Sequence, residues 1–125
     1  MSVTHSTAAA NAGIDAIVDL IDVGTTVTQG TIQWATSGDA TLCATQLQDP
    51  AFGTAAAKSS SLLGVPLTSS AATAGTVAKA FFQDQDNTEV FRCAVATSGG
   101  DINLSGVVLG TSETITLNSL TYSIT

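Results

Sequence analysis

The stretch FFQDQDNTEVF, residues 81–91, decides the fold because it joins two β-strand patterns through a polar turn. Residues 75–83 and 88–97 are two largely apolar runs, each with aromatic and β-branched residues, on either side of a polar segment. Such runs are typical of β-strands, and Asp and Asn favour the turn between them. The pattern predicts a β-hairpin in which residues 84–87 reverse the chain and Glu89 starts the return strand.

The acidic tip of this hairpin also raises the question of a cation site. Its oxygen ligands would come from Asp84, Asp86, Asn87 and Glu89. The tip lacks the invariant glycine and the closing bidentate glutamate of an EF-hand loop, and it lies between strands rather than helices. We therefore interpret it as a plain turn, with Phe81 and Phe91 facing the core, and we expect neither a metal nor a cofactor. Three further acids lie at other turns and could complete a cation site only if the fold gathered them: Asp39, Asp101 and Glu113.

Outward from this hairpin, strand patterns recur along most of the chain, and residues 31–36 show the period of two that is typical of half-buried strands. Residues 31–36 and 41–48 form a second predicted hairpin, with Ile32 and Trp34 pointing inward. Pro50 ends the second of these strands, since proline cannot donate to a strand ladder. Weaker or shorter strand patterns follow at residues 60–67, 102–104, 107–109, 114–117 and 120–124. Seven or eight short strands predict a mainly β fold, a two-sheet antiparallel β-sandwich of jelly-roll-like form.

The N-terminal segment has a different period and predicts one helix over about residues 6–22. Its apolar residues recur at helical spacing on one face, at Ile14, Ile17, Val18 and Ile21. The opposite, solvated face takes Asp15, Asp19 and Asp22. Ser6 or Thr7 is the expected N-cap, and Gly24 the expected stop. We expect this helix to pack against another surface, because Gly13 weakens its middle.

Composition bounds the size of the protein and the kinds of partner it takes. At 125 residues the chain fits one domain, residues 1–125, with the sandwich over about residues 30–125. Charged residues make up 10% of the chain, and the net charge is −7. Three basic residues give no patch that could neutralise phosphates, so we expect no direct nucleic-acid binding. An uncharged surface is typical of a protein whose faces are covered by partners, because few charges are then desolvated on docking.

Targeting patterns are missing from the sequence. It contains neither a run of 18 apolar residues nor a secretory signal pattern. We therefore expect synthesis in the cytoplasm and no association with a membrane.

Catalytic patterns are missing as well. His5 is the only histidine, and no G-x-S-x-G elbow accompanies the many serines. A serine nucleophile would lack a base, so we expect no enzyme activity and no catalytic residue. Cys43 and Cys93 fall inside strand patterns and are spaced like neither a metal knuckle nor a redox pair. They are either two buried reduced thiols or one disulfide.

Three stretches of the chain together resemble a known family. They are HSTAAANAGIDAIVDLID (residues 5–22), LQDPAFG (47–53), and TSGGDINL (97–104) leading to SLTY (119–122). Their order and spacing resemble a family of small tailed-bacteriophage virion proteins, whose members carry a DPAFG turn and an SG-x-D-I/L-N-L strand before a final S-L/F-T-Y strand. Cys43 and Cys93 depart from this pattern, in which apolar or hydroxyl residues are expected. The resemblance carries over no catalytic or binding residue.

The resemblance implies a structural role in a phage particle. The expected function is that of a capsid decoration or cement protein, which binds the major capsid protein lattice on the head exterior of the virion. An alternative is a neck, tail-tube or tail-fibre component, in which the sandwich assembles in rings with copies of itself. A third class, a carbohydrate-binding adhesin module, needs surface aromatics on which sugar rings stack. Trp34, Tyr122 and the phenylalanines fall mostly at inward strand positions, which disfavours that class.

Overall fold

The structure is a computed structural model that describes residues 3–71 and 73–124. It confirms a mainly β fold with one N-terminal helix. The helix α1 (Thr7–Asp19) continues into a short 3-10 turn, η1 (Leu20–Asp22). The strands within the described residues are β1 (Thr31–Ala35), β2 (Thr41–Gln46), β3 (Ser59–Ser61), β4 (Leu67–Ser70), β5 (Gly75–Thr76), β6 (Lys79–Gln83), β7 (Glu89–Ala96), β8 (Ile102–Asn103), β9 (Val108–Leu109), β10 (Thr114–Leu117) and β11 (Thr121–Ser123).

A five-stranded sheet in the order β2-β1-β6-β7-β8 forms the first layer. Its strands pair antiparallel except for β7 and β8, which run parallel. Both predicted hairpins are present, as β1–β2 and β6–β7. In the second, Asp84 N–H donates to Thr88 O at 2.9 Å and Asn87 N–H to Asp84 O at 3.1 Å, so residues 84–87 reverse the chain as predicted.

Strand register divides the side chains of this sheet between two faces. One cross-strand row comprises Cys43, Trp34, Ala80 and Cys93, and another comprises Thr45, Ile32, Phe82 and Phe91. The row between them comprises Ala44, Gln33, Phe81 and Arg92. Successive residues of a strand point to opposite faces, so the first two rows define the inner face and the third the outer face. Trp34, Ile32 and Phe82 are completely buried, which places the core against the inner face.

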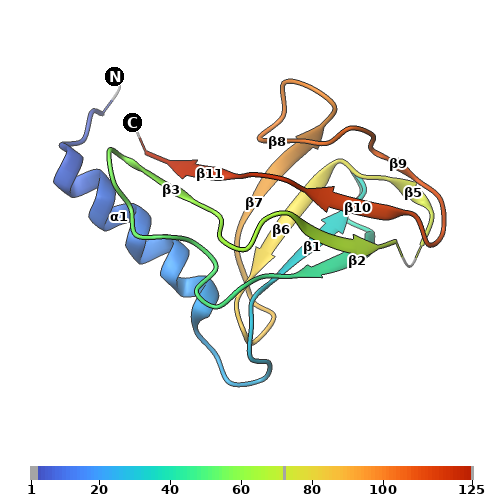
Figure 1. The fold of residues 1–125 in the computed structure, drawn as a ribbon, viewed down its shortest axis with the longest axis horizontal. Coiled ribbons are helices and arrows are strands. Elements are labelled where there is room, and N and C mark those ends of the chain that lie inside the picture. The colour runs from blue at the N-terminus through green and yellow to red at the C-terminus, as the bar shows by residue number, and fades with distance from the viewer. Residues whose placement is uncertain (1–2, 72, 125) are drawn as a thin grey trace.

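The second layer is a ribbon of two chain segments that crosses the five-stranded sheet (Figure 1). β4 pairs with β10 and β3 pairs with β11, both antiparallel. A polar contact joins the layers: the Trp34 indole N–H donates to Thr45 Oγ1 at 2.8 Å, and that hydroxyl lies 2.7 Å from Ser69 Oγ on β4. Two facing, mainly antiparallel layers make the β-sandwich that the sequence predicts.

α1 lies along one side of the sandwich, next to β3 and β11 (Figure 1). Ser6 is its N-cap, since the Ser6 hydroxyl accepts the N–H of Ala9 at 3.1 Å. Ile14, Val18 and Ile21 are buried, as the helical spacing predicts, and they join the hydrophobic cluster of the two β layers. The surface on which α1 packs is therefore the protein's own core. No helix in the described parts of the chain is long and apolar enough to cross a membrane.

Two predicted strands are each divided in the structure. The pattern at residues 60–67 overlaps the end of β3 and the first residue of β4, because Gly64, at a φ of 75°, and Pro66 interrupt the strand between them. The pattern at residues 75–83 contains both β5 and β6. β5 pairs with β9, whereas β6 belongs to the five-stranded sheet, so the chain passes from one sheet to the other at residues 77–78.

Candidate functional site

The polar side chains of the hairpin tip each make different contacts and do not converge on a common site. Asp84 Oδ1 accepts the N–H of Asp86 at 2.8 Å and that of Thr88 at 2.9 Å. Asn87 has a left-handed φ of 63°, a conformation that asparagine tolerates and that helps the chain to reverse. Glu89 pairs with a cation farther along β7. The tip is thus the turn that the sequence predicts.

Asp86 holds the loop that follows η1. Its Oδ1 accepts the N–H of Thr25 at 2.9 Å, the N–H of Thr26 at 3.0 Å and the hydroxyl of Thr26 at 2.9 Å. Donation from the Thr25 and Thr26 backbone holds the pKa of Asp86 below its ordinary value. Gly24, the predicted helix stop, has a φ of 136°, and a Cβ there would lie 2.8 Å from the backbone nitrogen of Asp86. Glycine is required at this approach of the loop to the hairpin tip.

The other acids considered for a cation site lie apart from this tip. Asp39 pairs with a lysine of β6, Asp101 accepts a backbone N–H of β7, and Glu113 lies at the turn before β10. Across the described residues, no group of three or more His, Cys, Asp or Glu side chains is placed to hold a metal ion. The fold does not bring these three acids together with the hairpin tip.

The polar face of α1 holds a loop through side-chain acceptors. Three side chains of the helical segment accept backbone N–H groups: Asn11 from Lys58 at 2.9 Å, Asp15 from Ala55 at 2.8 Å and Asp22 from Ala51 at 3.0 Å. The prediction that Asp15 and Asp22 are solvated is therefore wrong, whereas Asp19 is exposed. Helical spacing identifies their common face but not the loop that packs on it. Burial raises the pKa of Asp22.

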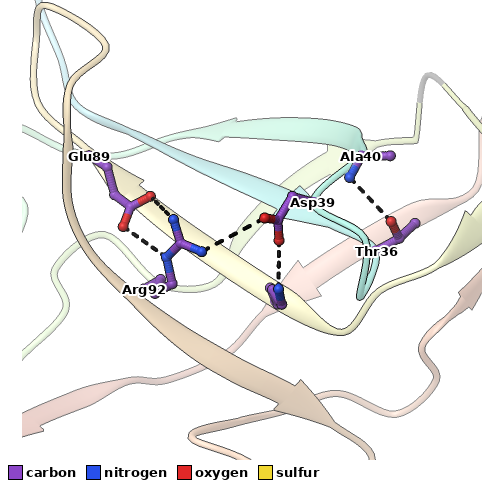
Figure 2. Close-up of polar contacts among 6 residues, drawn as sticks. Thr36, Asp39, Ala40, Glu89 and Arg92 are labelled. Carbon is purple, nitrogen blue, oxygen red and sulfur yellow. Dashed lines mark hydrogen bonds and ion pairs between the residues drawn. The ribbon is translucent and has the colours of Figure 1, made fainter.

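The outer face of the five-stranded sheet carries two of the three basic residues. Lys79 Nζ lies 2.6 Å from Asp39 Oδ1, and Arg92 donates to Glu89 through Nε at 2.9 Å and Nη2 at 2.7 Å. Asp39 Oδ2, 4.0 Å from Arg92 Nη1, joins the two pairs into one network (Figure 2). The hydrogen bond from Lys79 holds the pKa of Asp39 below its ordinary value. Two positive and two negative charges balance, so this face is close to neutral.

Phe81 belongs to the outer face, and the prediction that it faces the core is wrong. The Arg92 guanidinium carbon lies 4.4 Å from the Phe81 ring centroid, and the ring is only partly buried. Phe82 is the core residue instead, with 0% exposure and its ring centroid 4.5 Å from that of Phe91. Phe91 packs against the core as predicted.

A groove of about 370 Å³ lies between β7 and β11, where the two layers meet. The residues along it include Arg92, Cys93, Asp101, Thr121, Tyr122 and Ser123. The ring centroids of Phe91 and Tyr122 lie 5.1 Å apart and give it an apolar surface. Two of the sequence motifs meet here, because TSGGDINL supplies Asp101 and SLTY supplies residues 120–122. Sequence reasoning missed this groove, since its two walls come from strands far apart in the chain.

The third motif, LQDPAFG, lies on the other side of β3 from β11. Gly53 N–H donates to Ser61 O at 3.0 Å, and Phe52 forms an isolated bridge with Leu62. The DPAFG segment therefore extends the ribbon layer beside β3.

Cys43 and Cys93 are free thiols. They lie in the same cross-strand row of the inner face, with β1 and β6 between them. Three strand spacings place their Cα atoms about 14 Å apart, whereas a disulfide needs a separation below about 7 Å. Of the two alternatives, reduced thiols are confirmed. Cys43 is buried as predicted, but Cys93 is partly exposed at the groove, where burial and the nearby Asp101 carboxylate raise the pKa of Cys93 to about 12.

Aromatic side chains, the usual platforms for sugar rings, mostly face inward. Trp34 and Phe82 have 0% exposure and Phe52 has 4%. Tyr122 and Phe91 reach the surface partly, at the groove between β7 and β11. The inward positions expected from the strand pattern are confirmed for most of the aromatics.

Comparison with other proteins finds no family model, no curated protein and no solved structure that matches this chain. The resemblance to tailed-phage virion proteins stays a prediction, and function is argued from the residues and their geometry.

Proposed function

We propose that this protein is a virion structural protein of a tailed phage, which decorates the capsid by binding the outer surface of the major capsid protein lattice and stabilises the head. The order of its sequence motifs supports this role. A small β-sandwich with a packed core also suits a rigid element that spans neighbouring subunits.

The observation that carries the proposal is the outer face of the five-stranded sheet. The ribbon layer and α1 contribute to the core on the inner side. On the outer face, Ala44 is exposed and Gln33 and Phe81 are partly exposed, and the ion network around Arg92 is balanced. Docking such a face desolvates few unpaired charges, so modest contacts remain favourable. Repetition over a lattice then adds these contacts by multivalency.

Copy number tests the placement on the head. Mass spectrometry of purified virions would give the ratio of this protein to the major capsid protein. A decoration protein is expected at a number comparable with the capsid subunits. A number that fits only the rings of a neck or tail would refute head decoration and support the alternative placement.

A charge placed on the outer face tests which surface is used. Ala44→Glu adds a carboxylate to an exposed position of the central outer row. Binding to virions that lack the protein should weaken at least about tenfold, because the new charge is desolvated without a partner. Val108→Glu is the control, since Val108 is 72% exposed on β9, outside the five-stranded sheet. Equal binding of both variants and the unmodified protein would exclude the outer face.

A further inference from the structure

The outer edge of β7 is covered along only part of its length. Val95 N–H donates to Ala78 O on the β6 side, and Ala94 N–H points the other way, donating to Asp101 Oδ2 at 2.9 Å. Alternation places the N–H and C=O of Arg92 on the same outer edge as those of Ala94. β8 pairs only with the last two residues of β7. The edge is therefore open at Arg92.

β11 has an open edge at the same groove. It joins β3 through Leu120 O, which accepts a hydrogen bond of 2.9 Å, and through Ile124 N–H, which donates one of 3.2 Å. Thr121 and Ser123 alternate with these residues, so their backbone N–H and C=O groups point away from β3. Both residues are exposed and line the groove.

The groove therefore has an open strand edge on each side and the Phe91 and Tyr122 rings between them, within a lining that is otherwise mostly polar. Open edges carry unpaired donors and acceptors, which are templates for a further strand. The rings of Phe91 and Tyr122, together with Cys93, offer one side chain of such a strand an apolar contact.

We propose that this groove receives an extended segment of a partner protein in which a lysine or arginine adjoins an apolar residue. Its backbone pairs with Arg92 on β7 and with Thr121 on β11, which closes the seam between the two layers. This inference rests on the proposed function, under which the partner is the capsid protein.

Charge favours a cationic partner over a second copy of this chain. The Arg92 guanidinium is already bonded to Glu89, and Asp101 is the other charged side chain that lines the groove. Asp101 accepts a backbone N–H but pairs with no cation among the described residues. A second copy would bring a further net charge of −7 and would be repelled. A lysine or arginine beside Asp101 is attracted instead.

Hydrogen exchange tests the inference without any substitution. The full-length protein would be compared free and bound to virions that lack it, with exchange followed in peptides that cover β7 and β11. The open-edge amides of Arg92, Thr121 and Ser123 should exchange rapidly in the free protein and slowly in the bound one.

Variants test the backbone pairing directly. Thr121→Pro removes an N–H that makes no hydrogen bond within the described fold, and it should weaken virion binding about tenfold. Thr121→Val keeps the N–H and should retain more binding than Thr121→Pro, whereas Thr116→Val, at an exposed position of β10 away from the groove, is the control with unchanged binding. Asp101→Asn keeps an acceptor for Ala94 but removes the charge, so binding should weaken about threefold at low salt and become less salt-dependent. Circular dichroism and melting temperature confirm that each variant is folded.

The outcomes separate this inference from the proposed function. Binding to virions with unchanged exchange at β7 and β11 would overturn the groove and leave decoration standing. Failure of the protein to bind any virion lacking it would overturn both. Protection that rises with the concentration of the isolated protein would overturn the cationic partner and assign the groove to a second copy.

Discussion

Phe81 and Phe82 are adjacent in the chain, yet they belong to opposite faces of one sheet. Phe82 has 0% exposure and stacks on Phe91, whereas Phe81 is partly exposed beneath the Arg92 guanidinium. A strand turns successive side chains to opposite faces, so the pairing of β6 with β1 decides which ring is in the core. The inner face therefore holds the fold together, and the outer face is free to serve contacts.

The largest effect is expected at Phe82. Phe82→Ala removes a completely buried ring and leaves a cavity next to Phe91, which should lower the free energy of unfolding by about 3–5 kcal/mol. Phe81→Ala is the matched control and should cost about 1 kcal/mol, mainly through the lost contact with Arg92. Urea or guanidinium titration measures both. Equal losses at the two positions would mean that the two faces are not distinguished in this way.

A smaller effect is expected where the inner face meets the ribbon layer. Thr45→Val removes the hydroxyl that accepts from the Trp34 indole and contacts Ser69. The buried indole N–H then has no partner, which should cost about 1–3 kcal/mol of unfolding free energy. Thr116→Val, at an exposed position of β10, is the control. A neutral result for Thr45→Val would show that the polar contact does not tie the layers together.

The smallest effect is expected in the ion network of the outer face. The pKa of Asp39 lies below its ordinary value of 3.8, so the folded state favours the carboxylate, and this contribution is present above pH 3.8 and lost as pH falls through the folded pKa. Asp39→Asn should slightly lower the melting temperature at neutral pH, and the difference from the unmodified protein should vanish at acid pH. High salt should shrink the same difference. Asp19→Asn, at an exposed carboxylate of α1 that makes none of these ion pairs, is the control. A difference that grows on acidification would refute the assigned sign.

Sequence periodicity predicts the helix and strands of this fold better than it predicts which of them pair or pack together. The apolar residues of α1 and the inward Ile32 and Trp34 are confirmed, because each depends on spacing within one segment. The sequence does not predict residues 68–70 of β4, since LTSS carries little pattern and is fixed by pairing with β10. The prediction that Phe81 faces the core fails because either of two adjacent aromatic residues could point inward. The register shift next to Phe82 also interrupts the alternation of faces, so inward positions cannot be counted from the hairpin tip.

The candidate site depends still more on tertiary structure. The acidic tip could be assigned to a turn from residue types alone, but the partners of Asp86 lie some sixty positions away, at Thr25 and Thr26. Predicting the groove requires knowing which edges of β7 and β11 are hydrogen-bonded to other strands. No local sequence pattern shows which edge of a strand is paired. Its two walls come from β7 and β11, which only the tertiary structure brings side by side.

The single tryptophan and the single tyrosine provide two built-in optical reporters. Trp34 lies at the centre of the inner face, completely buried and hydrogen-bonded, so its emission follows the integrity of the whole sandwich. Tyr122 lies at the groove, 5.1 Å from Phe91, so its absorption senses the polarity there. Unfolding and occupation of the groove can therefore be followed separately in the unmodified chain, without attaching a dye.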